Sequence, residues 1–267
     1  MHSSIPAPPS PALAAPEQGA AEAPVPAELA ARLGQVRARV RQATATAGRT
    51  DDAVLLLAVS KTFGAPVVAA AARLGQRHFG ENYAQEAIAK MTALRAYPDL
   101  PPLEWHFIGP IQSNKTRLIA THFDWVQSID RISIAQRLSA QRPAGAAALQ
   151  VLIEVNISDE ASKSGSAPEH VPELAQAIAR LPNLELRGLI AIPEPGLAPA
   201  AQRLQFARLR QLLGEVRAAL DSSPAHPANA VPRLDTLSMG MSADFENAIA
   251  EGSTMVRVGS AIFGERT

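Results

Sequence analysis

The stretch Trp105-His106-Phe107-Ile108-Gly109-Pro110-Ile111-Gln112-Ser113-Asn114-Lys115 joins a short apolar strand to a polar turn that opens a helix. From Glu28 onward, strand-like and helix-like patterns of this kind alternate with short connections. Such alternation is typical of a parallel sheet with crossover helices. We expect strands at 54–59, 77–80, 105–108, 125–129, 149–155, 184–191, 236–239 and 255–258. Roughly eight strands is the number that closes a TIM barrel.

Helical patterns separate these strands, and the first of them, at 28–48, is basic and ends at a glycine. The others lie at 66–74, 83–93, 132–141, 168–179, 200–220 and 243–251. A doubly wound open sheet is the alternative fold. It would need fewer strands and usually a glycine-rich turn after the first, and Ser60-Lys61-Thr62-Phe63-Gly64 is no dinucleotide-binding fingerprint. We therefore predict a single (β/α)8 TIM barrel.

The chain divides into a short extension and one large domain. Its 267 residues are close to the ~250 typical of this barrel. Residues 1–26 are rich in proline and alanine and have no periodicity, so we predict a disordered extension there and the barrel at 27–267. The extension has neither the cationic start of a secretory signal nor the arginines of a transit peptide, and it carries Glu17 and Glu22.

Composition excludes several classes of function. The formal net charge is zero and the basic residues are spread along the chain, which argues against a nucleic-acid or membrane-binding face. The chain has no cysteine, so disulfides, thiolate metal sites and a cysteine nucleophile are excluded. Its six histidines are too scattered for a recognisable metal site, and no hydrolase or Walker motif is present. We expect a small-molecule partner and no metal.

Strand alternation predicts which polar side chains lie inside the barrel. The odd positions of 151–155 are all β-branched and would face the helices, which leaves Glu154 and Asn156 inside. The same alternation directs His106 and Arg257 inward. A buried, unpaired arginine is very costly. Either Glu154 or a ligand must therefore compensate Arg257.

The strand ends carry the candidate site, because sites in this fold lie at the carboxyl ends of the strands. Lys61 follows the first strand directly, and two segments rich in glycine and serine, 238–242 and 259–260, follow the last two. Phosphate sites in TIM barrels are commonly built from those two loops. Ser242 would also cap the helix at 243–251.

Five motifs together resemble one family. Besides 105–115 they are Ala58-Val59-Ser60-Lys61-Thr62, Phe79-Gly80-Glu81-Asn82-Tyr83, Leu237-Ser238-Met239-Gly240-Met241-Ser242 and Val256-Arg257-Val258-Gly259-Ser260-Ala261-Ile262-Phe263-Gly264. They resemble the signatures of the pyridoxal phosphate homeostasis proteins, single-barrel relatives of the alanine racemase barrel domain. The resemblance covers the chain from about Glu28 to its end.

This resemblance implies a fold-type III barrel that binds pyridoxal 5'-phosphate (PLP) as a Schiff base on Lys61. A Schiff base needs a neutral amine, which partial burial beside cationic Arg257 would favour. Arg257 would face the pyridine nitrogen and, being always protonated, could only donate to it, which makes the ring a poorer electron sink. Asn82 would line the cofactor or cap the following helix. The remaining cofactor-binding residues implied are Ser238, Gly240, Ser242, Gly259 and Ser260, where Ser260 replaces the threonine of many relatives and keeps its hydroxyl.

The family implies a cytoplasmic, monomeric protein of intracellular PLP (vitamin B6) homeostasis, with PLP-dependent apoenzymes as candidate recipients and no catalytic residue. The alternative is an amino-acid racemase or related fold-type III enzyme, with Tyr83 or His106 as the second base that racemisation needs. Isotope exchange at Cα of L- and D-alanine separates the two. A third reading, a barrel for another phosphorylated metabolite, predicts a colourless protein. We expect the 112–115 turn to cap the next helix and shape the site rim.

Overall fold

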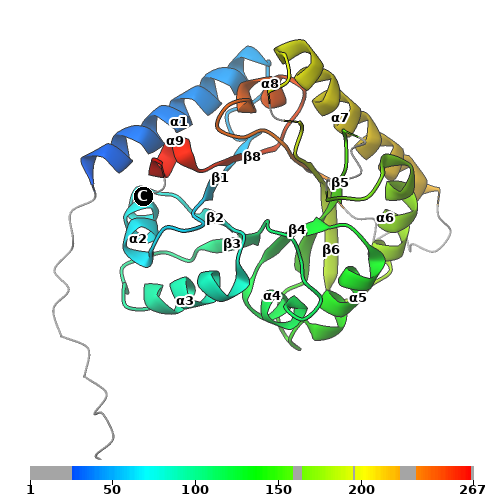
Figure 1. Ribbon diagram of the computed structural model, residues 1–267, viewed down its shortest axis with the longest axis horizontal. Helices are drawn as coiled ribbons and strands as arrows, with labels where there is room; N and C mark the ends of the chain where they lie inside the picture. The colour runs from blue at the N-terminus through cyan, green and yellow to red at the C-terminus, as the bar shows by residue number, and fades with distance from the viewer. Residues whose placement is uncertain (1–25, 159–163, 195, 223–232, 266–267) are drawn as a thin grey trace, which may run out of the picture.

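The computed structural model describes residues 26–158, 164–194, 196–222 and 233–265 (Figure 1). The predicted extension at 1–26 lies outside these residues except for Pro26. The strands are β1 (Leu55–Val59), β2 (His78–Glu81), β3 (Glu104–Phe107), β4 (Trp125–Ile129), β5 (Leu149–Val155), β6 (Leu184–Ala191), β7 (Thr236–Ser238) and β8 (Met255–Val258). The helices are α1 (Ala27–Thr46), α2 (Ala65–Arg73), α3 (Ala84–Leu94), α4 (Thr116–His122), α5 (Ile132–Gln141), η1 (Pro168–His170), α6 (Val171–Ala179), α7 (Pro199–Asp221), α8 (Phe245–Ala250) and α9 (Ser260–Phe263).

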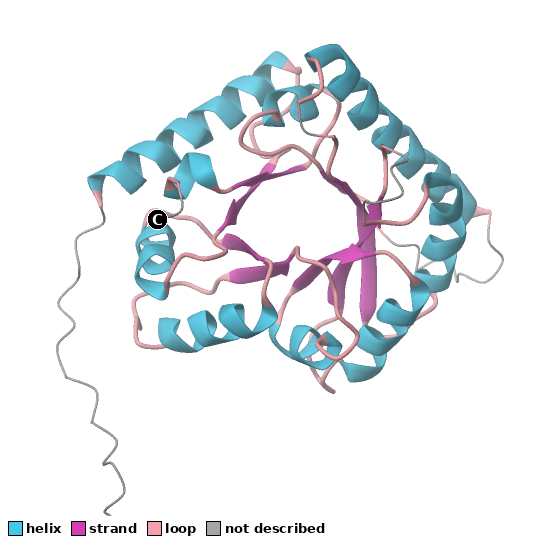
Figure 2. Ribbon diagram, in the orientation of Figure 1, coloured by secondary structure: helices cyan, strands magenta, loops and turns pink. Residues whose placement is uncertain are grey.

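The strands follow one another in chain order around a closed barrel, and every neighbouring pair is parallel. Closure comes from β1, which pairs with β2 on one side and with β8 on the other, with Leu57 opposite Arg257. Helices surround the strands (Figure 2). The predicted (β/α)8 barrel is confirmed, and the open-sheet alternative is excluded by the β1–β8 pairing.

Alternate residues of β5 belong to two separate apolar cores. Val151 and Ile153 belong to the large core shared by strands and helices. Leu152, between them, belongs to a small cluster inside the barrel together with Leu57 and Trp125. The predicted alternation of β5 is thereby confirmed.

The first helix packs against the last two. Along α1, the buried residues Leu29, Leu33, Val36 and Val40 recur at helical spacing and form one apolar stripe. Figure 1 shows α1 running past α9 and α8, and both helices contact it. The two ends of the described chain are therefore joined by helix packing as well as by strand pairing.

The closing segment differs from prediction in its helix boundaries. The helix expected at 243–251 begins at Phe245, and 242–244 form a turn. Ser242 as its N-cap is therefore wrong, because Asp244 occupies that position. The Asp244 Oδ1 accepts the Met241 N–H at 2.6 Å, so the carboxylate stabilises the turn instead of the helix. The short helix α9 was not expected.

Gly109, in the middle of the 105–115 stretch, is required by a close backbone contact. A Cβ there would lie 2.2 Å from the carbonyl oxygen of Asn82. The Gly109 carbonyl in turn accepts a hydrogen bond of 2.5 Å from Ser128 Oγ. Because only glycine fits, this stretch sets the backbone position of Asn82.

The polar turn at 112–115 does not cap α4 as expected. Lys115 occupies the N-cap position and makes no side-chain capping bond. The turn is closed by its backbone, where the Lys115 N–H donates to the Gln112 carbonyl at 2.9 Å.

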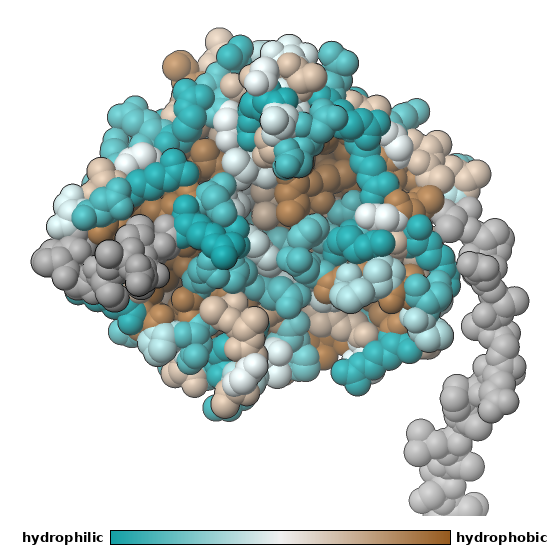
Figure 3. All heavy atoms as spheres, turned by 180° about the vertical axis from the view of Figure 1, so that it is seen from behind, coloured by the Kyte–Doolittle hydropathy of each residue, from teal (hydrophilic) through white to brown (hydrophobic). Residues whose placement is uncertain are grey.

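Among the described residues, no helix is both long and apolar enough to cross a membrane. On the face shown in Figure 3, hydrophilic residues cover most of the perimeter, and hydrophobic ones show mainly in the recesses between them.

Replacing Gly109 by alanine should destabilise the fold by about 3 kcal/mol or more, because the clashing atom belongs to the backbone and cannot rotate away. The matched control is Gly214→Ala in α7, where a Cβ meets nothing within 4 Å. That change should raise stability by up to about 1 kcal/mol. Urea unfolding of both variants provides the test, and equal midpoints would contradict the role given to Gly109.

Candidate functional site

Ser60, the residue before Lys61, is held by buried polar groups. Its N–H donates to the Gly80 carbonyl at 3.0 Å, and its Oγ donates to Glu81 Oε1 at 2.6 Å. Lys90 Nζ donates to the Ser60 carbonyl at 2.8 Å and to Glu81 Oε1 at 2.5 Å. Burial raises the pKa of the Glu81 carboxyl, and Lys90 opposes that rise. This network fixes the end of β1.

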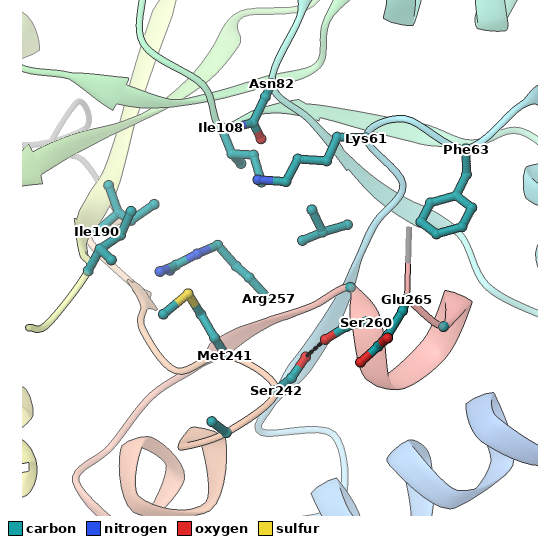
Figure 4. A pocket seen from close by; sticks show the side chains of 15 residues that line it. Lys61, Phe63, Asn82, Ile108, Ile190, Met241, Ser242, Arg257, Ser260 and Glu265 are labelled. Atoms are coloured by element: carbon teal, nitrogen blue, oxygen red, sulfur yellow. Dashed lines mark hydrogen bonds between the residues drawn. The ribbon is translucent and has the colours of Figure 1, made fainter. Parts of the chain in front are cut away.

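The residue after Lys61 has a strained backbone. Thr62 has φ of 72°, in the left-handed region that β-branched residues avoid. Such a conformation costs on the order of 1–3 kcal/mol and persists only where its surroundings enforce it. Here the Thr62 N–H donates to Glu86 Oε1 at 2.8 Å. The backbone next to Lys61 is therefore constrained, and the Lys61 side chain extends into a cavity (Figure 4).

That cavity has a volume of about 550 Å³, within the range of small-molecule sites. It lies at the carboxyl ends of the strands. Its lining consists of Val59, Lys61, Phe63, Asn82, Ile108, Ile190, Ile192, Met241, Ser242, Ala243, Arg257, Gly259, Ser260, Gly264 and Glu265.

Arg257 enters the cavity from inside the barrel and is 4% exposed. Its Nη1 donates to the Ser238 carbonyl at 2.7 Å and to Ser238 Oγ at 2.9 Å, and its Nη2 donates to the Ala191 carbonyl at 3.0 Å. Within the described ranges its Nε donates to no protein atom and no carboxylate forms an ion pair with it. Pairing with Glu154 is therefore not how the fold compensates it.

The charge of Arg257 persists despite its burial. Burial lowers the pKa of Arg257 to about 10, and the more distant carboxylates of Asp244 and Glu154 oppose that change. At neutral pH the guanidinium is thus protonated and acts as a donor only.

Backbone and hydroxyl donors gather at the opposite end of the cavity. Ser260 Oγ and Ser242 Oγ lie 3.4 Å apart (Figure 4). The backbone N–H groups of Ser242, Ala243 and Ser260 have no acceptor among the residues placed by the structure. Converging N–H and O–H donors of this kind suit an anion.

Asn82 contributes a buried polar atom that is not satisfied by the protein. Its Oδ1 has no hydrogen-bond partner among the described atoms, and Figure 4 shows its side chain beside Lys61 and Ile108. The residue at the N-cap of α3 is Tyr83, so the capping role considered for Asn82 is wrong. Buried polar atoms normally have partners, and a ligand would supply one.

The structure brings most of the predicted residues to this one cavity. Those that line it are Lys61, Asn82, Ser242, Arg257, Gly259 and Ser260. Ser238 and Gly240 lie outside the lining. Ser238 holds the guanidinium of Arg257, and the Gly240 carbonyl accepts the Arg257 N–H at 3.0 Å.

The apolar part of the lining was missed. Phe63, Ile108 and Met241 lie within or beside the quoted motifs, and Ile190 stands near the end of a strand, so strand-end position was the available signal. The two candidate second bases lie outside the lining. Tyr83 is 58% exposed, and His106 is fully buried in the barrel interior.

Comparison with known proteins agrees with this site. The family model described as alanine racemase, N-terminal domain, matches residues 31–267. A pyridoxal phosphate homeostasis protein of Pseudomonas aeruginosa is 56% identical over 238 residues, which cover 89% of this chain and 96% of that protein. This chain belongs to the pyridoxal phosphate homeostasis protein family. The Escherichia coli K12 member of that family is 49% identical, over 90% of this chain and 97% of its own.

A solved structure also matches this chain. PipY of Synechococcus elongatus, with PLP bound, has a TM-score of 0.73 and 34% identity, and the match covers 88% of this chain and all of that one (100%). The family resemblance inferred from the motifs is confirmed.

Breaking the buried pair behind Lys61 should be costly. Lys90→Met leaves the Glu81 carboxylate buried without its cation, and we expect a loss of about 3–5 kcal/mol in unfolding free energy. The double variant Glu81→Gln/Lys90→Met removes both charges and should recover much of that loss. Chemical denaturation measures the unfolding free energy of both variants. A double variant no more stable than Lys90→Met would contradict the coupling of the two charges.

Proposed function

We propose that this protein binds PLP in the cavity, holds it on Lys61 and serves intracellular PLP homeostasis. The observation that carries the proposal is that one cavity is lined by Lys61, by Arg257, which can only donate hydrogen bonds, and by the backbone N–H groups of 242, 243 and 260, which suit an anion. Family membership and the PLP-bound state of PipY support it.

The residues fit the parts of PLP. When bound, PLP supplies an aldehyde that reacts with a primary amine and a ring that withdraws electrons. Lys61 is the amine, and the N–H and hydroxyl groups of Ser242 and Ser260 would hold the phosphate. Arg257 Nε would donate to the ring nitrogen. Asn82 Oδ1, which lacks a partner among the described atoms, would accept a hydrogen bond from the bound ligand.

The cavity favours holding the cofactor over catalysis. A protonated Arg257 can only donate a hydrogen bond, so it would keep the ring nitrogen of bound PLP unprotonated and make the ring a weaker electron acceptor. A racemase needs a base on each face of its substrate. Neither Tyr83 nor His106, the two second bases considered for the racemase alternative, lines the cavity, and we propose no robust activity of the protein's own.

We further propose that the protein acts as a cytoplasmic monomer and that PLP-dependent apoenzymes receive its cofactor. The zero net charge supports a small-molecule role without nucleic acid or membrane partners. The relatives named above are bacterial pyridoxal phosphate homeostasis proteins, which supports an intracellular site of action.

The purified protein should be yellow, and borohydride reduction followed by peptide mass mapping should place the pyridoxyl group on Lys61. Lys61→Ala should abolish the label, whereas Lys115→Ala, on a turn outside the cavity, should keep it. Label on another lysine would contradict the assignment of Lys61 as the PLP-binding lysine. A colourless, unlabelled protein would instead favour another phosphorylated ligand.

Ser260→Ala should weaken PLP retention by about 1.5–3 kcal/mol, because a hydroxyl bond to a charged phosphate is lost. Ser133→Ala, at an exposed position of α5, is the matched control and should leave the dissociation constant unchanged. Equilibrium titration of PLP measures both constants. An unaltered constant for Ser260→Ala would remove this hydroxyl from the phosphate site.

A further inference from the structure

A continuous line of hydrogen bonds crosses the barrel interior from the cavity to the opposite end. It starts at Arg257 and passes to Ser238 Oγ, which donates to Gln127 Oε1 at 2.7 Å. Gln127 Nε2 lies 2.9 Å from His106 Nδ1, and His106 Nε2 lies 3.2 Å from His78 Nδ1. His78 is the first residue of β2, so the line ends where the strands begin.

The direction of every bond in this line follows from its first member. Arginine has no acceptor, so Ser238 Oγ accepts from Arg257, and the one hydrogen of Ser238 is donated to Gln127 Oε1. The Gln127 amide then turns its Nε2 toward His106, and the same Nε2 lies 3.1 Å from Met255 Sδ. His106 Nδ1 must therefore be unprotonated, and its proton lies on Nε2, facing His78.

Burial makes this direction hard to reverse. Ser238, Gln127 and His106 are each 0% exposed, so a bond turned the wrong way leaves a buried polar group unsatisfied, at a cost of about 1–3 kcal/mol. Burial also holds the pKa of His106 well below its ordinary value. A neutral His106 cannot donate from both nitrogens, which leaves a single tautomer.

The far end of the line is accessible to titration. Burial lowers the pKa of His78, while the carboxylates of Glu104 and Asp124 oppose the change. Glu104 Oε2 lies 3.5 Å from His78 Nδ1 and accepts a hydrogen bond of 3.2 Å from Trp125 Nε1. A protonated His78 would place an N–H against the N–H of His106, so the line requires neutral His78.

His78, Glu104 and His106 also have a spacing that could hold a metal ion. A metal on His106 Nε2 requires the proton on Nδ1, which is the opposite tautomer. The direction set by Arg257 therefore argues against a metal ion here.

We propose that this line orients the cofactor-facing guanidinium: Gln127 is the positioning residue for Arg257 through Ser238, and neutral His78 terminates the line, so that protonating His78 loosens PLP. The proposal rests on the proposed function, in which Arg257 faces the PLP ring. The tautomer of His106 can be tested without PLP, so this proposal and the proposed function can fail separately.

The tautomer arm uses the PLP-free protein and histidine ¹⁵N NMR. His106 should carry its proton on Nε2 in the parent protein. Gln127→Glu replaces the donor by an acceptor of the same shape and should move the proton to Nδ1, whereas Gln42→Glu, exposed on α1, should leave it. A parent protein with the Nδ1–H tautomer, or stoichiometric binding of added Zn²⁺ at His106, would overturn the proposal.

The cofactor arm measures PLP dissociation constants. Gln127→Met, which keeps the size and removes the amide, should weaken PLP roughly threefold to thirtyfold, as expected for one or two lost buried hydrogen bonds. The control Gln42→Glu should bind as the parent does. A Gln127→Met protein that folds and binds PLP as tightly as the parent would overturn the positioning role, whereas a parent that binds no PLP would overturn the proposed function alone.

The pH arm compares the parent with His78→Gln, whose Oε1 can still accept from His106 but cannot titrate. As the pH falls through the lowered pKa of His78, the PLP affinity of the parent should show a decrease that His78→Gln lacks. Phosphate protonation affects both proteins equally, so the difference between them is the readout. Superimposable profiles would overturn the coupling to His78.

Discussion

Among the residues that the structure describes, the guanidinium of Arg257 forms no ion pair, and its hydrogen bonds inside the barrel go to carbonyl and hydroxyl oxygens. It takes them from the ends of β6 and β7, through the carbonyl of Ala191 and both oxygens of Ser238. Because a buried charge is costly without hydrogen-bond partners, the guanidinium ties together the three neighbouring strands β6, β7 and β8. The loops that leave β7 and β8 start from this point, and with them the donors of Ser242 and Ser260.

A second charged system fixes the opposite wall of the cavity by different means. There Lys90 and Glu81 form a buried ion pair that also holds Ser60. Lys61 therefore projects from the end of β1, beside a pair of charges, Lys90 and Glu81, that neutralise each other. The two walls therefore differ. The wall behind Lys61 contains the ion pair of Lys90 and Glu81, whereas the other contains the single cation Arg257, whose hydrogen bonds go to the Ser238 and Ala191 carbonyls and the Ser238 hydroxyl.

Much of this arrangement could be predicted from sequence, and the reasons for the failures are local. Arg257 lies between Val256 and Val258, so alternation alone sent it inward, and Lys61 follows a strand too apolar to be misread. The acceptors of Arg257 could not be predicted, because two of the three are backbone carbonyls, and their position relative to the guanidinium depends on how β6, β7 and β8 are staggered. Ser242 and Asp244 are equally good N-cap residues in isolation. The choice between them rests on the Asp244 bond to the Met241 N–H, a tertiary detail of the loop.

Lys61 follows β1 and Ser260 follows β8, so the two walls of the cavity come from segments that lie far apart along the chain. The ribosome makes β1 long before β8, the strand that pairs with it, and α1 long before α8 and α9, the helices that cover it. A nascent chain that has reached β6 therefore carries Lys61 without the loops that hold Ser242 and Ser260, and its β1 has an unpaired edge that can pair with wrong partners. The cavity is therefore complete only after β8 and α9 have been made, and fragments cut short before that point should expose the β1 edge to chaperones and proteases.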